Sequence, residues 1–229
     1  MTIGIIGAMD EEIELLKQKM TDVQEIEVAK TYFYQGYLEG KKVVLLLSGI
    51  GKVNAAMSTT ILHERFNPDK IINTGSAGGF AENLEVGDVV ISTGVLHHDV
   101  DATAFNYVYG QVPGMPAVYN PSPDLVELAD KVVLDSDIQA ETGIIATGDS
   151  FMQRKDQTAV VRERFPEMLA LEMEAAAIAQ VCYQYKTPFV IIRALSDIAG
   201  KESSISFDVF LEKAAKNAAD VIIKMVQRL

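Results

Sequence analysis

The segment KIINTGSAGG, residues 70–79, carries the clearest indication of the fold. Its first half, Lys70–Thr74, is a short apolar run that predicts a buried strand. The strand ends in the glycine-rich run Gly75–Gly79, and segments of the same kind recur on both sides of it along the chain. The sequence therefore predicts a series of short strands, each followed by a turn or a helix.

Working outward, short apolar or alternating segments predict further strands at Ile3–Ile6, Thr31–Leu38, Lys42–Leu47, Asp88–Thr93, Ala140–Thr147, Leu169–Met173 and Phe189–Leu195. Helical periodicity predicts helices over Asp10–Met20, Val53–Arg65, Asp124–Leu134, Thr158–Arg164, Glu174–Tyr185 and Ser206–Leu229. Because strands alternate with helices, the predicted fold class is α/β with a largely parallel sheet. No linker, repeat or low-complexity tract is visible, so we expect one domain over residues 1–229.

Composition excludes several functional classes. Of the 229 residues, 48% are hydrophobic, which is enough for a substantial core, and the net charge of −12 disfavours nucleic acids and acidic membrane surfaces as partners. No apolar run reaches the roughly 18 residues of a membrane span, and the first residues lack the basic segment of a signal peptide. We therefore expect a cytoplasmic protein. The one cysteine, Cys182, lies in an apolar stretch and is expected to be a small buried residue.

Open parallel sheets bind ligands beyond the carboxyl ends of their strands. That rule selects the segments Ala8–Glu12, Ser48–Gly51, Gly75–Gly79, Gly148–Met152, Met173-Glu174 and Ser196-Asp197. The segment His98–Pro123 is different, because it is long and rich in proline and aromatic residues. A loop of this length within a compact domain usually has a function.

Four motifs within these segments resemble those of a known family. GIIGAMDEE (residues 4–12) resembles the opening of bacterial methylthioadenosine/S-adenosylhomocysteine nucleosidases, and NTGSAGG (73–79) resembles the signature of the wider nucleoside phosphorylase superfamily. LEMEAA (171–176) resembles the ribose-binding segment of that family, and RALSD (193–197) its purine-site segment. The four motifs occur in the family's order over nearly the whole chain, which makes the resemblance specific.

The resemblance implies a three-layer α/β/α fold with a mixed, largely parallel central sheet and a homodimer. It also implies irreversible hydrolysis of the N-glycosidic bond of 5′-methylthioadenosine and S-adenosylhomocysteine, with neither a metal nor an organic cofactor.

The proposed chemistry needs an acid at the leaving group, because adenine leaves poorly as an anion. The resemblance assigns protonation of adenine N7 to Asp197, which follows the apolar strand Phe189–Leu195. A dry environment favours the protonated form of a carboxyl group. Taken without the other motifs, a Ser-Asp pair is more often a helix cap or turn.

Two further carboxylates follow from the same resemblance. Glu12 activates the attacking water, and Ser76 and Arg193 help to place that water. The alternative for Glu12 is compensation of a helix dipole, which the neighbouring acidic residues already provide. Glu174 binds the ribose hydroxyls, and carboxylates near the sugar stabilise its cationic transition state. Glu172 would share a face with Glu174 on an extended strand and support it.

The remaining expected contacts are with the substrate. Phe151 stacks on adenine, and Met152 offers main-chain groups to its Watson–Crick edge, although the Met152 side chain itself is expected in the core. Further substrate contacts are expected from Met9, Ile50 and Phe207 at the 5′-thio group, from Met173 at the sugar, and from Gly78 and Ser196 of the two motifs. In the resembling family, the loop that here contains Phe105 and Pro113 closes the 5′-thio pocket of the neighbouring subunit.

Two weaker motifs point elsewhere. Gly49-Ile50-Gly51 follows a strand and opens a helix like a dinucleotide fingerprint, but Asn54 takes the place of the third glycine, so a tight turn is the better interpretation. His97-His98 suggests a metal site, but neighbouring side chains on a strand point to opposite faces. We expect a solvated or interface segment there.

Three alternative functions remain open. A nucleoside phosphorylase needs cations for its phosphate, and here Asp10, Glu11 and Glu12 would repel phosphate while Arg193 alone is a poor anion site. A hydrolase for another nucleoside, such as a futalosine-type compound, is the second alternative. The third is a nucleoside-binding protein without catalysis, which the presence of both Glu12 and Asp197 disfavours.

Overall fold

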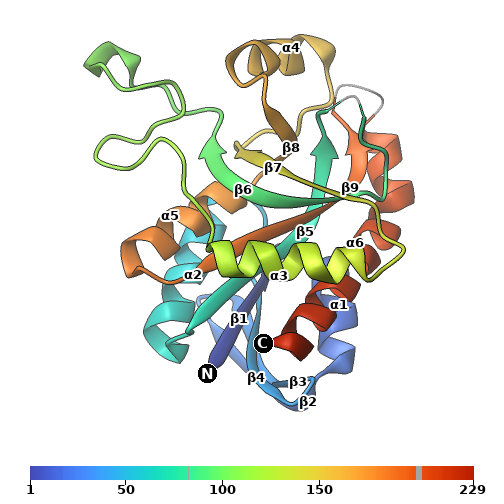
Figure 1. Ribbon diagram of the computed structural model, residues 1–229. Helices are drawn as coiled ribbons and strands as arrows, with labels where there is room; N and C mark the ends of the chain where they lie inside the picture. Colours follow the sequence, from blue (N-terminus) through green and yellow to red (C-terminus); the bar gives the residue numbers. More distant parts are fainter. Residues whose placement is uncertain (82, 200–202) are drawn as a thin grey trace.

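A mixed nine-stranded sheet forms the centre of the computed structural model, which describes residues 1–81, 83–199 and 203–229. The strand order is β2-β3-β4-β1-β5-β8-β7-β6-β9, and helices cover both faces of the strands (Figure 1). The family-based prediction of a mixed, three-layer α/β/α architecture is confirmed.

The strands are β1 (Thr2–Gly7), β2 (Thr21–Val28), β3 (Thr31–Leu38), β4 (Lys41–Leu47), β5 (Lys70–Gly79), β6 (Val89–His97), β7 (Ala140–Thr147), β8 (Met168–Glu172) and β9 (Phe189–Ile198). The helices are α1 (Asp10–Lys19), α2 (Lys52–Phe66), α3 (Pro123–Leu134), α4 (Lys155–Arg164), α5 (Ala175–Tyr185) and α6 (Ser203–Arg228), with a 3-10 turn at Thr103–Phe105.

One half of the sheet closes on itself. Strand β1 pairs in parallel with both β4 and β5. Strand β9 pairs in parallel with β5 and antiparallel with β6, so that β5, β8, β7, β6 and β9 form a ring of paired strands. This closure, which alternation of strands and helices does not reveal, brings the ends of β5, β8 and β9 close to one another.

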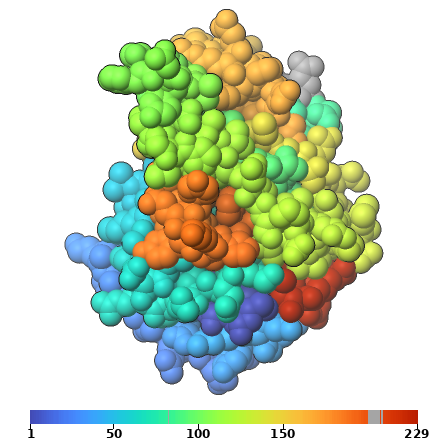
Figure 2. Space-filling model, turned by 60° about the vertical axis from the view of Figure 1, so that its left-hand side comes forward, coloured from blue at the N-terminus to red at the C-terminus, as the bar shows by residue number. Residues whose placement is uncertain are grey.

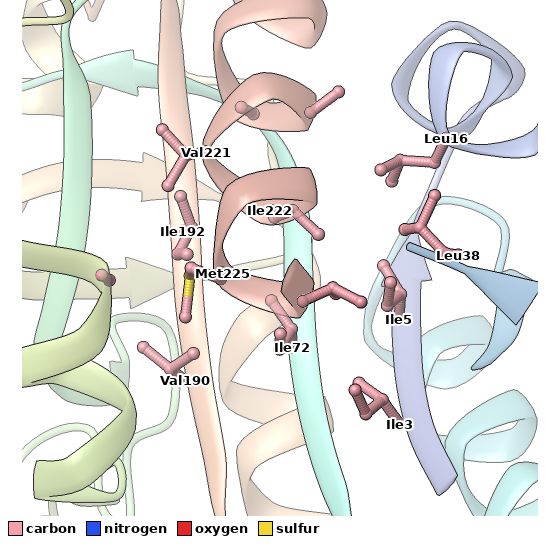
Figure 3. Packing of buried hydrophobic residues seen from close by; sticks show 14 of the residues in the cluster. Ile3, Ile5, Leu16, Leu38, Ile72, Val190, Ile192, Val221, Ile222 and Met225 are labelled. Carbon is pink, nitrogen blue, oxygen red and sulfur yellow. The ribbon is translucent and has the colours of Figure 1, made fainter. Parts of the chain in front are cut away.

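Apart from α4, the helices divide into two layers. Helices α1, α3 and α6 pack on one face of the strands, where Ile72, Ile192 and Met225 belong to one buried apolar cluster (Figure 3). Helices α2 and α5 pack on the other face, in a second cluster that contains Cys182. Cys182 is fully buried, as its apolar surroundings in the sequence predict. Within the described residues, no helix is long and apolar enough to span a bilayer.

Strands β5 and β9 are longer than predicted, and this difference matters for the site. The run Gly75–Gly79 continues β5, and Ser196-Asp197 lies inside β9. Asp197 is therefore neither a helix cap nor a turn residue. Glycines weaken the apolar signal of a strand, but they permit the close approach of β9 seen here.

Strand β2 is absent from the sequence prediction. Its residues are mostly polar and exposed, and it lies at the edge of the sheet, where it pairs only with β3. A residue with positive φ, Asp22, also interrupts its pairing. Its two half-buried residues, Ile26 and Val28, alternate with Glu27 and pack against the second cluster, but this run is too short to predict a strand.

Candidate active site

One cavity of about 410 Å³ gathers most of the predicted site residues. It lies where β5, β8 and β9 meet the first turn of α1. Its walls are formed by Ala8, Met9, Glu12, Ile50, Ser76, Ala77, Gly78, Phe151, Leu171, Glu172, Met173, Glu174, Ser196, Asp197 and Phe207. A small recess beside it adds Met152. Of the residues predicted at the site, only Arg193, Phe105 and Pro113 lie outside both hollows.

Glu12 is held by four donors in the first turn of α1. Its Oε2 accepts hydrogen bonds from the N–H groups of Ala8 (2.8 Å) and Met9 (3.3 Å). Its Oε1 accepts from both the N–H (2.8 Å) and the Oγ (2.9 Å) of Ser76. The preceding residues Asp10 and Glu11 are exposed, whereas Glu12 is buried against the cavity. Dipole compensation therefore does not account for the inward orientation of this third acidic residue.

Gly75 allows Glu12 and Arg193 to approach the strand. A Cβ atom at Gly75 would lie 2.1 Å from Nη1 of Arg193 and 2.9 Å from Oε1 of Glu12. Any side chain at this position would displace both charged groups, so the glycine of the motif is needed for the site as well as for the strand.

Arg193 lies on β9, fully buried behind the cavity wall. Its Nη2 donates to Oδ1 of Asn73 (2.9 Å) and to Oε2 of Glu172, and it lies 3.5 Å from Oε2 of Glu174. Its Nη1 donates to the carbonyl of Ser76 at 3.3 Å. Burial alone would lower the pKa of this guanidinium, but the neighbouring carboxylates outweigh burial and raise it.

Glu172 connects this charged group to helix α5. Its Oε2 accepts from the N–H groups of Glu174 (2.9 Å) and Ala175 (2.8 Å) at the start of the helix, where a negative charge is favourable. Its Oε1 accepts from the hydroxyl of Thr147. Glu172 thus touches the cavity and also supports Glu174 and Arg193. We refer to Glu12, Glu172, Glu174 and Arg193 as the carboxylate cluster.

Glu174 lies between the carboxylate cluster and the turn before α2. Its Oε1 accepts a hydrogen bond from the N–H of Gly51 at 2.8 Å. Burial, reinforced by the charge of Glu172, raises the pKa of Glu174 to about 8, although Arg193 opposes the shift. Burial in this site therefore favours the protonated form of Glu174 more than solvent does.

Asp197 is buried on β9, opposite Gly78 of β5. Its Oδ1 accepts a hydrogen bond from Oγ of Ser196 at 2.9 Å. A Cβ atom at Gly78 would lie 3.2 Å from Oδ2 of Asp197, so a larger residue at this position would crowd the carboxyl group. Both Gly78 and Ser196 thus contact the predicted acid, which gives these motif positions a physical role.

The other end of the cavity is apolar and open. Phe151 is 43% exposed and Ile50 is 51% exposed. The rings of Phe151 and Phe207 meet edge to face, with centroids 5.9 Å apart. The Met152 side chain is half-buried and packs against a separate apolar cluster, as predicted.

The predicted loop residues lie away from the cavity of this chain. Phe105 is 77% exposed, and Pro113 is also exposed. The segment that contains them projects beside α4 (Figures 1 and 2), where the guanidinium of Arg164 lies 3.8 Å from the ring centre of Tyr109. Neither residue completes the site from within the same chain.

His97 and His98 correct one prediction. Both side chains are buried, not solvated, and burial lowers both pKa values. His97 Nε2 lies 3.1 Å from Oε1 of Gln180, while the ring of His98 packs against Gly148. Among the described residues, no group of three or more His, Cys, Asp or Glu side chains is arranged to hold a metal ion.

The Gly49-Ile50-Gly51 segment is the tight strand-to-helix turn that was predicted. Both glycines have positive φ angles, +79° and +92°. The N–H of Gly51 is used by the Glu174 carboxyl group. This helix start is therefore occupied by a carboxyl group of the chain itself rather than open to a dinucleotide phosphate.

Residues 2–227 match the Phosphorylase superfamily. A 5′-methylthioadenosine/S-adenosylhomocysteine nucleosidase of Oceanobacillus iheyensis is 73% identical over 229 residues, covering 100% of both chains. The chain belongs to this nucleosidase family.

Solved structures agree with this family assignment. The nucleosidase of Neisseria meningitidis, in complex with methylthio-immucillin-A, is 49% identical with a TM-score of 0.98, and the match covers 100% of this chain and 99% of that one. Futalosine hydrolase of Helicobacter pylori is 34% identical with a TM-score of 0.94, covering 100% of this chain and 98% of that one. The fold is thus shared with a protein described as a futalosine hydrolase.

Sequence reasoning missed some of the residues that support this nucleosidase site. Thr147 binds Glu172, and Asn73 binds Arg193, yet neither had an assigned role. Thr147 is the last residue of β7, so the rule that sites lie beyond strand ends offered a signal. Asn73 lies inside β5, before the glycine run, and its partner Arg193 lies on the paired strand β9. The sequence around Asn73 gives no signal for this contact.

Proposed function

We propose that this member of the nucleosidase family hydrolyses the N-glycosidic bond of 5′-methylthioadenosine and S-adenosylhomocysteine. The products are adenine together with 5-methylthioribose or S-ribosylhomocysteine. The observation that carries the proposal is the convergence of Glu12, Glu174 and Asp197, from three separate elements, on one cavity with an apolar end.

Asp197 is the proposed acid. Its carboxyl group is buried and lies next to the recess beside Phe151 and Met152, where a stacked adenine has room. Transfer of its proton to N7 lets adenine leave as a neutral molecule. General acid catalysis of this kind contributes about 10²–10⁴ in rate.

Glu12 is the proposed base for the attacking water. Ser76 fixes Oε1 of Glu12, and Arg193 in turn binds the carbonyl of Ser76, so the three residues form one hydrogen-bonded unit. The water gives its proton to Glu12 as its oxygen attacks the anomeric carbon. Each step is assigned to side chains and water alone.

Glu174 is the proposed partner of the ribose diol, with Met173 against the sugar. Its Oε1 is fixed by Gly51, which leaves its other oxygen near Arg193 to meet the hydroxyls. As the sugar becomes cationic, an ionised Glu174 would stabilise it electrostatically.

Charge favours water over phosphate as the nucleophile. The cavity wall contains Glu12, Glu172 and Glu174, while the nearby cation Arg193 is already paired with Glu172. A phosphate dianion would meet three carboxyl groups without an unpaired guanidinium. A phosphorylase on the same scaffold is therefore disfavoured.

The apolar end favours a thioether substituent on the ribose. Met9, Ile50 and Phe207 line this end and offer no charged partner. We further propose a homodimer in which Phe105 and Pro113 of a second copy cover the opening. A futalosine-type substrate is the second candidate. It is included in the test because the futalosine hydrolase of Helicobacter pylori has the same fold.

The test is incubation with methylthioadenosine, S-adenosylhomocysteine, a futalosine-type nucleoside and inosine, each with and without phosphate. We expect free adenine and a reducing sugar from the first two compounds, at rates independent of phosphate. A sugar 1-phosphate product, or turnover that requires phosphate, would contradict hydrolysis. Preference for the futalosine-type nucleoside would favour the second candidate.

A further inference from the structure

A second group of charged residues lies beside the cavity, outside the proposed catalytic machinery. Nζ of Lys52, the first residue of α2, donates to both carboxylate oxygens of Asp99, at 2.7 and 2.9 Å. The Lys52 and Asp99 side chains are 21% and 29% exposed. This pair is thus better shielded from solvent than an ordinary surface ion pair.

Asp149 joins the pair into a closed unit. Oδ2 of Asp99 accepts a hydrogen bond from the N–H of Asp149 at 3.0 Å. Oδ1 of Asp149 accepts from the N–H of Lys52 at 2.8 Å. We call Lys52, Asp99 and Asp149 the Asp99 cluster. It connects the chain after β6, the start of α2 and the chain after β7.

Two of the three segments that the cluster connects carry site residues. On one side, Lys52 directly follows Ile50 and Gly51, and the N–H of Gly51 binds Glu174. On the other side, Asp149 lies two residues before Phe151, which lines the cavity. A Cβ atom at Gly51 would lie 3.2 Å from Oδ1 of Asp149, so the two segments are in close contact.

We propose that Asp99 is a positioning residue that fixes the spacing between the turn Ser48–Gly51 and the loop Gly148–Phe151. This inference rests on the proposed function, because it assigns the turn to the sugar side and the loop to adenine. A ligand that contacts both segments needs their spacing, whereas adenine, which is proposed to contact Asp197 and the loop, does not reach the turn. Asp99 would thus determine how well the site accepts a whole nucleoside.

The chemistry of the cluster requires a carboxylate at Asp99. Two donors, the ammonium group of Lys52 and the N–H of Asp149, converge on its oxygens. Burial opposes its charge, yet these two donors lower the pKa of Asp99 below its usual value. An asparagine offers one oxygen, and its amide N–H₂ would face one of the donors.

The experiment compares a whole nucleoside with adenine. Asp99→Asn and Lys52→Met remove the contacts, Lys52→Arg retains the charge, and Asp135→Asn breaks a matched ion pair with Arg228 on α6, away from the cavity. Dissociation constants for a non-hydrolysable methylthioadenosine analogue and for adenine are measured by calorimetry, and thermal unfolding shows that each variant is folded.

We expect Asp99→Asn and Lys52→Met to weaken the analogue about tenfold, equivalent to about 1.4 kcal/mol, with less than about a twofold change for adenine. Lys52→Arg should restore most of the affinity, and Asp135→Asn should bind both ligands as the unchanged protein does. Equal losses for both ligands, or no loss for either, would overturn the inference. If the unchanged protein neither binds the analogue nor releases adenine, the proposed function itself fails, which is a distinct result.

Discussion

The two ends of the cavity are built in different ways. At the sugar end, the carboxylate cluster is buried, and every member is fixed by hydrogen bonds to strands or helix starts. At the apolar end, Phe151 and Ile50 come from loops and remain about half exposed. One chain thus suffices to place the proposed reacting groups, while the apolar end offers surface that a single chain leaves uncovered.

The contrast has an energetic cause. A buried carboxylate is costly unless several donors compensate it, so the sugar end must be fully connected within the folded chain. Apolar side chains need no specific partner, and they can be covered by any complementary surface, including a ligand or a second copy. The following changes test each end in turn, from the largest expected effect to the smallest.

Asp197→Asn should have the largest effect. Asparagine keeps the shape of the side chain but cannot supply the proton to N7, so we expect kcat for adenine release to fall by about 10²–10⁴. Binding of substrate should persist, as measured by calorimetry. Asp135→Asn serves as the control. A kcat within a few fold of the unchanged protein would remove Asp197 from the mechanism.

Glu12→Gln should reduce kcat by about 10² or more, because the amide cannot accept the proton of the attacking water. It should still bind nucleoside. The neighbouring exposed Glu11 gives a matched control on the same helical turn, and Glu11→Gln should leave kcat unchanged. Stopped assays of adenine release measure both variants, and equal rates in the two would show that Glu12 is not the base.

Phe105→Ala addresses the apolar end. If a second copy covers that end, the Kd for methylthioadenosine should rise by about tenfold, which corresponds to about 1.4 kcal/mol. This loss is smaller than the ~3–5 kcal/mol cost of removing an aromatic ring from a protein core, because the pocket is partly open. Adenosine, which lacks the thioether tail, should be affected less. Sedimentation reports the oligomeric state in parallel. Equal losses for both ligands, or a fully active monomer, would contradict the shared site.

Glu174→Gln tests the raised pKa at the sugar end. In the folded chain the pKa of Glu174 is raised to about 8 from the ordinary 4.5. Its contribution to stability is therefore fully present below pH 4.5, falls as the pH rises, and is lost above about pH 8. The slope for one proton is at most about 1.4 kcal/mol per pH unit.

Glutamine does not titrate, so the stability of Glu174→Gln relative to the unchanged protein should rise between pH 5 and pH 8. Urea unfolding at several pH values measures this difference, with Glu11→Gln as the control. Parallel pH dependence in Glu174→Gln and the unchanged protein would show that Glu174 holds no proton in the ligand-free site.

The sequence predicts most of the fold, because buried strands and amphipathic helices have clear periodicities. It does not predict β2, which is mostly polar and has only a short alternating run at Ile26–Val28, or the extension of β5 through Gly75–Gly79. The closure of the strands through β9 depends on pairing between distant segments. The periodicity of apolar residues along the chain does not indicate which distant segments pair.

The site was predictable where a motif contains the residue. Glu12, Ser76, Glu174 and Asp197 all line the cavity, although their chemical roles stay predictions. The connections between motifs were less accessible. Asp99, for example, follows two histidines in a segment expected to be solvated or at an interface, and only the folded chain places it against Lys52.

The burial of Cys182 gives the chain a chemical reporter of its own opening. The sequence contains one thiol, and burial raises its pKa, so reagents that attack thiolates reach it only when α5 separates from the strands. The rate of thiol labelling then reports local or global opening of the packing around α5. Helix α5 starts directly after Glu174, so we expect a ligand that binds Glu174 as proposed to slow this event. Occupancy of the cavity can thus be followed by mass spectrometry on the unaltered protein.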